Sequence, residues 1–379
     1  MKKDYKILFF GMEEPSMKSL KTLLCLLLIM FMVMGNFKSI QAEAKEISIS
    51  VPKIKVKTVK KGTSLKIIIS KTKDAEGYEV YVSGTGSAYS DYMQFSTDYQ
   101  KVADVTKNGK AKRTITFKTF PAGTYKVKVR SYNNKKFGYK IYSDFSAEKT
   151  ITLKEASNGY KSSYDFSKIK KGDIIKFGAY EQDGDFSNGK EPIEWIVLEK
   201  TKKDILVVSK YAIDRVPYNN DYNNNITWET SYLRKGLNDK FYSNAFNETE
   251  KGMIKVTMVE NYDNVVYKTA GGNDTKDRIF LLSQLEMINS DYGFSDSYDE
   301  YDINRRCAPT AYVIARGIEI GSFYKTSDDE NTCRWWLRTP GLQPYAAALV
   351  GSNGIVSPNG EHVYDNECGV RPALYISIK

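Results

Sequence analysis

The sequence predicts a signal peptide, then an all-β sandwich, then an α+β domain. Near the N-terminus, twelve apolar residues follow one another without interruption. Between residues 47 and 153, apolar and polar residues alternate with a period of two, which buries one face of a sheet. From residue 168 onward, strand-like runs are mixed with helix-capping patterns and Asn-Gly turns, as in a mixed fold.

Residues 1–44 have the pattern of a secretory signal peptide. The apolar run spans Leu23 to Met34, Lys18 and Lys21 precede it, and Ala42-Glu43-Ala44 supplies the small residues preferred at the cleavage site. The run is shorter than the ~20 apolar residues that span a bilayer, so an uncleaved anchor is the alternative. No later segment is long and apolar enough to be transmembrane. We therefore expect a secreted, extracellular protein, either free or associated with the cell wall.

The basic charge is concentrated in the first half of the chain. Residues 45–155 carry 23 Lys and Arg against 10 Asp and Glu, a net charge of +13, whereas residues 156–379 carry 27 against 32, a net charge of −5. On an exported protein, this excess favours anionic wall polymers or membrane surfaces as partners. The alternative is a lysine-rich, solvated sheet face. Nucleic acid is not expected, because the protein is exported and the lysines alternate along strands.

Residues 45–155 show short alternating strands separated by turns, which is typical of an immunoglobulin-like sandwich. Gly123–Tyr132 resembles the F strand of fibronectin type III domains, and Gly77–Tyr81 resembles their C strand, although the usual strand B tryptophan is absent. The resemblance implies a spacer or adhesive module. It also makes Tyr125 the structural tyrosine-corner residue.

Residues 156–167 are polar and have the composition of a linker, and residues 168–379 form the α+β domain. Residues 193–198 and 205–209 predict a hairpin, and Thr227 is placed to cap a helix that reaches Leu237. Asn247 and Glu250 have capping-box spacing, as do Ser283 and Glu286. A helical turn is expected at 311–315, and hairpin turns at 353–354 and 359–360.

Several short sequence motifs in residues 168–379 are considered together. They are Gly178–Tyr180, Pro192–Leu198, Tyr211–Asp214, Thr227–Arg234, Trp335–Gly341 and Gly369–Leu374. They resemble one bacterial family of secreted domains of unknown function, whose hallmarks are Trp-Trp-Leu-Arg-Ser-Pro-Gly and Gly-Val-Arg-Pro-Ala-Leu. Thr339 stands where the family has Ser. The family implies no activity. The layout also resembles the C-type-lectin-like fold, which includes the formylglycine-generating-enzyme group.

The Trp-Trp-Leu-Arg segment supplies the first candidate site. In a strand, Trp335 lies on one face and Trp336 and Arg338 share the other. Trp335 is then expected to be structural, while Trp336 and Arg338 would meet a sugar face or an anionic group. The alternative is that Trp336 is covered and Arg338 pairs with a buried carboxylate. Arg371 is expected to be structural, tying the last strand to a neighbouring carboxylate.

The loops at 339–345 and 351–366 lie beside these strands. The lectin-like resemblance implies that such loops form the variable binding face. The candidate ligand-binding residues there are Tyr345, Asn353, Asn359, His362 and Tyr364.

Evidence for a cofactor or for catalysis is sparse. Asp291–Asp302 and Asp328–Asn331 are rich in oxygen ligands that suit Ca²⁺, but neither has EF-hand spacing, so solvated loops are preferred. One histidine and the scattered Cys307, Cys333 and Cys368 give no zinc pattern, and no motif supports His362 with Cys368 as a nucleophilic pair. The pairing of the cysteines is left open. An enzyme is therefore the less favoured class.

The sequence thus predicts a secreted or cell-surface binding or adhesion protein. Its C-terminal domain would recognise a carbohydrate, a cell-wall polymer or a surface protein. The alternatives are an extracellular hydrolase or modifying enzyme that uses the same cleft, and a purely structural surface protein.

Overall fold

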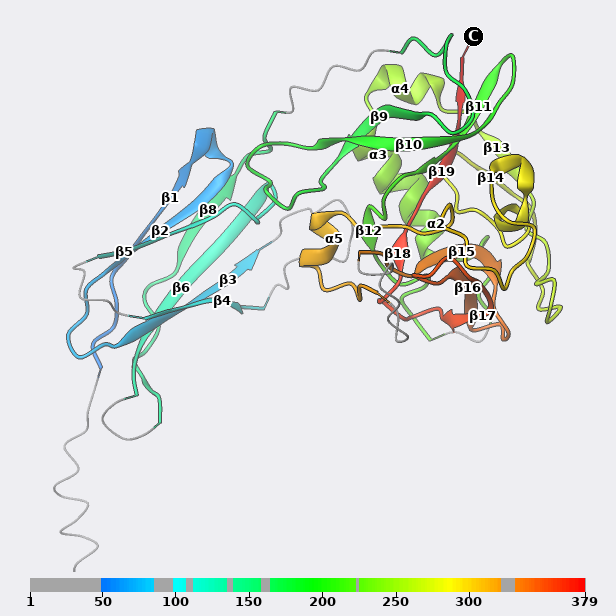
Figure 1. The fold of residues 1–379 in the computed structure, drawn as a ribbon. Coiled ribbons are helices and arrows are strands. Elements are labelled where there is room, and N and C mark those ends of the chain that lie inside the picture. The colour runs from blue at the N-terminus through cyan, green and yellow to red at the C-terminus, as the bar shows by residue number, and fades with distance from the viewer. Residues whose placement is uncertain are drawn as a thin grey trace, which may run out of the picture.

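The computed structural model describes residues 49–84, 98–106, 112–134, 139–157, 164–222, 225–321 and 331–378 (Figure 1). The predicted signal peptide and the acidic residues 328–330 lie outside these ranges. The described chain is mostly β-sheet with few helices, as the sequence predicts. Within these ranges, no helix has the length and hydropathy needed to cross a bilayer.

The described residues up to Leu153 form two antiparallel sheets. One sheet has the order β1 (Ile54–Val59), β2 (Ser64–Ser70), β5 (Lys112–Phe117). The other has the order β4 (Gln100–Thr106), β3 (Gly77–Gly84), β6 (Gly123–Asn133), β7 (Ile141–Tyr142), with β8 (Lys149–Leu153) also paired to β6. A short 3₁₀ turn at Lys60–Gly62 joins β1 to β2.

The two sheets share one hydrophobic core. In β2, Leu65, Ile67 and Ile69 are fully buried, and Val127 and Val129 of β6 are also fully buried. This is the period of two that the sequence shows. Tyr125, also in β6, is fully buried, and its hydroxyl donates to the Pro121 carbonyl at 2.8 Å. That bond is the one a tyrosine corner requires.

The remaining described residues form three sheets. A four-stranded antiparallel sheet has the order β19 (Ala373–Ser377), β11 (Asp204–Ser209), β10 (Glu191–Lys200), β9 (Ile174–Tyr180). A five-stranded sheet has the order β12 (Asp214–Arg215), β18 (Gly369–Val370), β15 (Trp335–Pro340), β16 (Ala346–Val350), β17 (Val356–His362). β13 (Thr257–Val259) and β14 (Thr275–Asp277) form a separate pair. The predicted hairpin at 193–198 and 205–209 is confirmed as β10 and β11.

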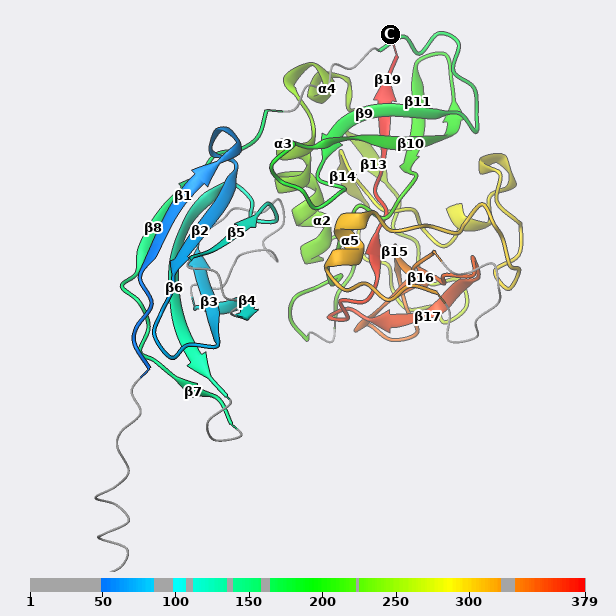
Figure 2. The same ribbon diagram turned by 60° about the vertical axis from the view of Figure 1, so that its left-hand side comes forward.

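The last two strands connect the two larger sheets. β18 lies in the five-stranded sheet, β19 lies in the four-stranded sheet, and only Arg371 and Pro372 separate them. In Figure 2, β9, β10, β11 and β19 gather toward the C-terminal end, away from β16 and β17. A single hydrophobic core extends through both sheets. Phe166, which lies within the predicted linker 156–167, is buried in that core.

The helices are short. They are α2 (Tyr232–Gly236), a π turn (Leu237–Phe241), α3 (Tyr242–Ala245), α4 (Glu248–Met253), 3₁₀ turns (Glu286–Ile288 and Ser290–Tyr292) and α5 (Ala311–Ala315). The predicted helical turn at 311–315 is confirmed as α5. The expected cap at Thr227 is wrong, because α2 begins later and Ser231 accepts from the Arg234 amide instead.

Two predicted capping boxes are present. Asn247 and Glu250 exchange their reciprocal bonds at the start of α4. Ser283 and Glu286 do the same, with the Ser283 amide donating to the Glu286 carboxylate at 2.6 Å and the Glu286 amide donating to Ser283 Oγ at 3.1 Å. Glu250 also accepts from the Gly178 amide at 2.9 Å, which ties α4 to β9.

One predicted hairpin turn takes a different form. Asn353 and Gly354 lie in the turn between β16 and β17, as expected. Asn359 and Gly360 instead lie inside β17, where three residues oppose one residue of β16. The positive φ of Gly360 suits a bulge as well as a turn, so the dipeptide alone does not distinguish them.

Candidate functional site

β15 places both tryptophans of the Trp-Trp-Leu-Arg motif in the core. Trp335 and Trp336 are both fully buried, and their indole N–H groups donate to the carbonyls of Arg305 and Val216, each at 3.1 Å. Tyr218 packs edge-on against Trp336, with ring centroids 5.8 Å apart. The expectation that Trp336 faces a ligand is therefore wrong. All six residues of β15 are buried because both faces of this strand are covered.

Arg338 is fixed by the protein itself. Its side chain is 5% exposed and donates to the Leu281 carbonyl at 2.8 Å, to the Glu260 carbonyl at 3.1 and 3.3 Å, and to the Glu286 carboxylate. This is the alternative that the sequence left open, in which Arg338 pairs with a carboxylate. Arg338 nevertheless lines a surface groove, described below.

Arg371 occupies the crossing between the two larger sheets. It is 1% exposed, and its guanidinium donates to the carbonyls of Ser209 at 2.8 Å and Arg305 at 3.3 Å. The guanidinium carbon lies 4.9 Å from the centre of the Trp335 ring. The predicted carboxylate partner is wrong, because backbone carbonyls and an aromatic face take that place among the described residues.

Three of the predicted ligand residues meet at the surface. Tyr345 and His362 stack nearly parallel, with centroids 5.2 Å apart and planes 9° apart, and Tyr364 lies 5.3 Å from His362. Tyr222 completes the group, 5.9 Å from Tyr345 and 5.7 Å from Tyr364. We call these four residues the aromatic cluster. Tyr222 is 62% exposed and Tyr364 is 46% exposed.

Backbone pairing brings these rings together from distant parts of the chain. The Val363 amide donates to the Tyr345 carbonyl at 2.9 Å, which sets His362, at the end of β17, and Tyr364, in the turn that follows, against Tyr345. The Asn219 amide donates to the Val363 carbonyl at 2.7 Å, and the Ile226 amide donates to the Pro344 carbonyl at 3.0 Å. These bonds hold both ends of the segment that carries Tyr222. Sequence reasoning missed Tyr222 because this pairing spans more than 100 residues.

Asn353 and Asn359 have local structural roles. The Asn353 side chain accepts from the Ile355 amide at 3.1 Å within the hairpin turn. Asn359 accepts from the Tyr267 hydroxyl, next to the bulge in β17. Both asparagines form these bonds outside the aromatic cluster, so the structure joins only part of the predicted loop face.

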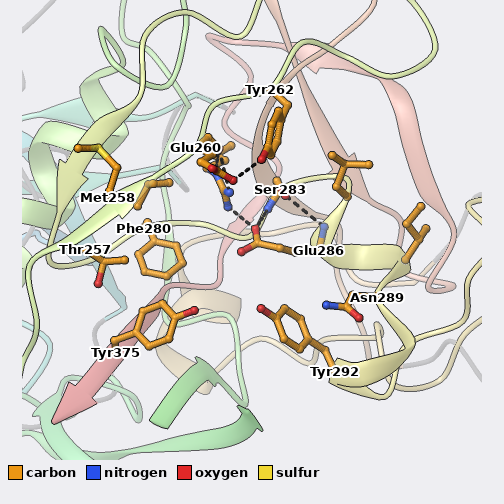
Figure 3. A pocket seen from close by; sticks show the side chains of 14 residues that line it. Thr257, Met258, Glu260, Tyr262, Phe280, Ser283, Glu286, Asn289, Tyr292 and Tyr375 are labelled. Carbon is orange, nitrogen blue, oxygen red and sulfur yellow. Dashed lines mark hydrogen bonds and ion pairs between the residues drawn. The ribbon is translucent and has the colours of Figure 1, made fainter. Parts of the chain in front are cut away.

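A groove of about 600 Å³ lies in front of Arg338 (Figure 3). We call it the Arg338 groove. Its walls come from β13, the segment around the Ser283 capping box, β15 and β19. The lining residues are Thr257, Met258, Val259, Glu260, Tyr262, Phe280, Ser283, Leu285, Glu286, Ile288, Asn289, Tyr292, Arg338 and Tyr375.

One carboxylate trio among the described residues is close enough to share a cation. Glu181 and Asp183 lie in the loop between β9 and β10, and their carboxylate oxygens and that of Glu191, the first residue of β10, are within 4.8 Å of one another. Burial, together with the Glu191 charge, raises the pKa of Glu181 to about 8. Residues 291–302 are the loop considered above for Ca²⁺. There, the Asp302 carboxylate accepts from the Ser295 and Asn304 amides, each at 2.8 Å.

The three cysteines in the described ranges lie in the core and are unpaired. Cys307, Cys333 and Cys368 are buried and free, and burial raises the pKa of each thiol. A thiol that stays protonated is a poor nucleophile. His362, the suggested partner of Cys368, stacks on Tyr345 in the aromatic cluster. These positions do not favour a nucleophilic pair.

Comparison with known proteins gives a domain assignment without an activity. A family model described as "Domain of unknown function (DUF6273)" matches residues 202–378. No curated protein matches the chain. The matched segment begins just before β11 and contains Trp335–Gly341 and Gly369–Leu374, while β9 and β10 precede it and complete its four-stranded sheet. Residues 202–378 are therefore similar to this family of domains of unknown function.

Proposed function

We propose that this chain is a secreted or cell-surface binding protein that recognises a carbohydrate or a cell-wall polymer. The observation that carries the proposal is the aromatic cluster. Its four rings come from three segments of the chain, and Tyr222 and Tyr364 are 62% and 46% exposed. Large exposed aromatic groups of this kind commonly mark interaction sites.

The chemistry of the cluster suits a sugar better than a purely apolar partner. A sugar ring presents C–H groups on its faces and hydroxyls at its edge, and tyrosine offers an apolar ring with a polar tip. Polar groups flank the rings, with Asp221 next to Tyr222 and Asn366 two residues after Tyr364. Asn366 accepts from Arg215 at 3.0 Å, so this rim is partly ordered.

The first two sheets fit the role of a spacer or wall-adherent module. The proposal includes a fibronectin type III-like identity for residues 45–155 and a lectin-like layout for the C-terminal domain. Lys53, Lys55 and Lys57 are exposed in and beside β1, where they would favour anionic wall polymers. This attraction would be non-specific and salt-sensitive, whereas the aromatic cluster would provide selectivity.

The test is binding of residues 45–379 to a glycan array and to isolated cell-wall polymers, with calcium and with chelator. The chain carrying both Tyr222→Ala and Tyr364→Ala should keep its fold, because both rings are exposed. Its affinity should fall at least roughly tenfold, since each lost stacking contact contributes about 1 kcal/mol.

Tyr301→Ala is the matched control, because Tyr301 is 64% exposed and belongs to another loop. Equal binding by the double variant would remove the aromatic cluster from the proposal. If the folded chain binds no glycan or wall polymer, a surface-protein partner or a structural role would be favoured instead.

A further inference from the structure

The Arg338 groove combines aromatic rings with carboxylates. Figure 3 shows Phe280 and Tyr375 on one side and Tyr292 on the other, with the Tyr375 and Tyr292 hydroxyls pointing toward each other. Glu286 lies above these hydroxyls, and Glu260 and Tyr262 form the upper rim. A volume of about 600 Å³ is within the range for a small-molecule site.

The charges around the groove do not balance. Arg338 is neutralised by Glu286, and Lys255, whose ammonium nitrogen lies 5.9 Å from the centre of the Tyr375 ring, pairs with Asp204. Glu260 has no cationic partner among the described residues and accepts only from the Tyr262 hydroxyl there. The groove therefore keeps a negative charge although an arginine forms its back wall.

Nearby carboxylates affect the pKa of the two tyrosines at the floor of the groove, Tyr292 and Tyr375. Burial raises the pKa of the Tyr292 and Tyr375 hydroxyls, and the charges of Glu199 and Glu286 raise both further. Glu199 has no cationic partner within the described ranges. Glu199 thus adds to the negative potential at the floor, while the charge of Glu286 is balanced by Arg338.

We propose that the Arg338 groove binds organic ammonium groups. The aromatic rings would contact the cation, which is attracted to their electron-rich faces. The carboxylates of Glu260 and Glu286 would accept its N–H hydrogens, and charge-assisted bonds of this kind are stronger than neutral ones. A neutral sugar or peptide would make the ring contacts but would lack the electrostatic attraction to the carboxylates.

Organic ammonium groups of this kind occur in amino sugars and in lysine side chains. The groove and the aromatic cluster share no residues. The test is NMR titration of residues 45–379 with glucosamine and with Nα-acetyl-lysine methylamide. Each probe is paired with its N-acetylated form, which removes the charge. We expect one or both ammonium probes to bind at least roughly fivefold more tightly than their acetylated partners, less so at high salt. The preferred probe identifies the source.

Variants locate the site. Glu260→Gln is the main variant, because Glu260 is exposed and its side chain is not part of the core. It should reduce the preference for the charged probe several-fold, while Glu248→Gln, at a site 91% exposed on α4, should not. The Tyr222→Ala, Tyr364→Ala chain should bind as wild type does, which separates this inference from the proposed function. Equal binding of charged and acetylated probes, no binding, or an unchanged preference in Glu260→Gln would overturn it.

Discussion

Replacing Glu181 with glutamine tests the electrostatics of the loop between β9 and β10. Glu181 is 1% exposed, and its carboxylate accepts from the Gly184 amide at 2.7 Å. Burial and the Glu191 charge raise its pKa from 4.5 to about 8. The folded chain therefore holds this proton more tightly than the unfolded chain does.

The sign of the effect follows from the direction of this shift. A carboxyl whose pKa is raised on folding contributes its full stability below pH ~4.5, and that contribution is lost as the pH rises to about 8. Each tenfold change in proton affinity corresponds to about 1.4 kcal/mol, which sets an upper value of about 5 kcal/mol. Local rearrangement and water entry reduce such penalties, so we expect roughly 2–4 kcal/mol.

Urea unfolding of wild type and Glu181→Gln, at about pH 5 and about pH 9, measures this difference. The two proteins should have similar free energies of unfolding at the lower pH, and the variant should be the more stable at the higher pH. Chelator is present throughout, because a cation on Glu181, Asp183 and Glu191 would favour the ionised form. Glu248→Gln is the exposed control. A difference between wild type and Glu181→Gln that does not change with pH would refute the reasoning.

Two further predictions concern the bulge in β17 and the buried thiols. A Cβ at Gly360, whose φ is +71°, would lie 2.0 Å from the Ala347 carbonyl oxygen, so Gly360→Ala should lower the free energy of unfolding by roughly 3 kcal/mol or more. At Gly184, φ is +78° but a Cβ would have no atom within 4 Å, so Gly184→Ala should lower the free energy of unfolding by only about 1 kcal/mol in urea unfolding. Equal losses of stability in the two variants would contradict the predicted clash at Gly360. Cys307, Cys333 and Cys368 should react with a thiol reagent only after unfolding, and all three should then be found. Rapid labelling of the folded chain, or fewer thiols after denaturation, would show that this arrangement is wrong.

Much of the local structure could be predicted from short-range patterns. The alternation in β2 and β6, the hairpin of β10 and β11, and two capping boxes all depend on residues close in sequence. Asn359-Gly360 shows the limit of this approach. A positive φ is compatible with a turn and with a bulge, and the pairing with β16 decides between them.

The candidate site could be predicted only in part. Tyr345, His362 and Tyr364 were selected because they were expected in loops beside Trp335–Gly341 and Gly369–Leu374, and the structure places the three rings together. Trp336 was misplaced because alternation along a strand shows which residues share a face and not whether that face is covered. In β15 both faces are covered, so Trp336 is as fully buried as Trp335.

The sequence by itself determined the β-rich character and two capping boxes, since these follow from the periodicity and hydrogen-bonding capacity of neighbouring residues. Only the tertiary structure decided the partners of the arginines and the composition of the surface sites. Arg371 bonds to Ser209, 162 residues away, and Tyr222 joins rings more than 100 residues further along the chain. Such contacts depend on how whole sheets pack against one another, which no local pattern encodes.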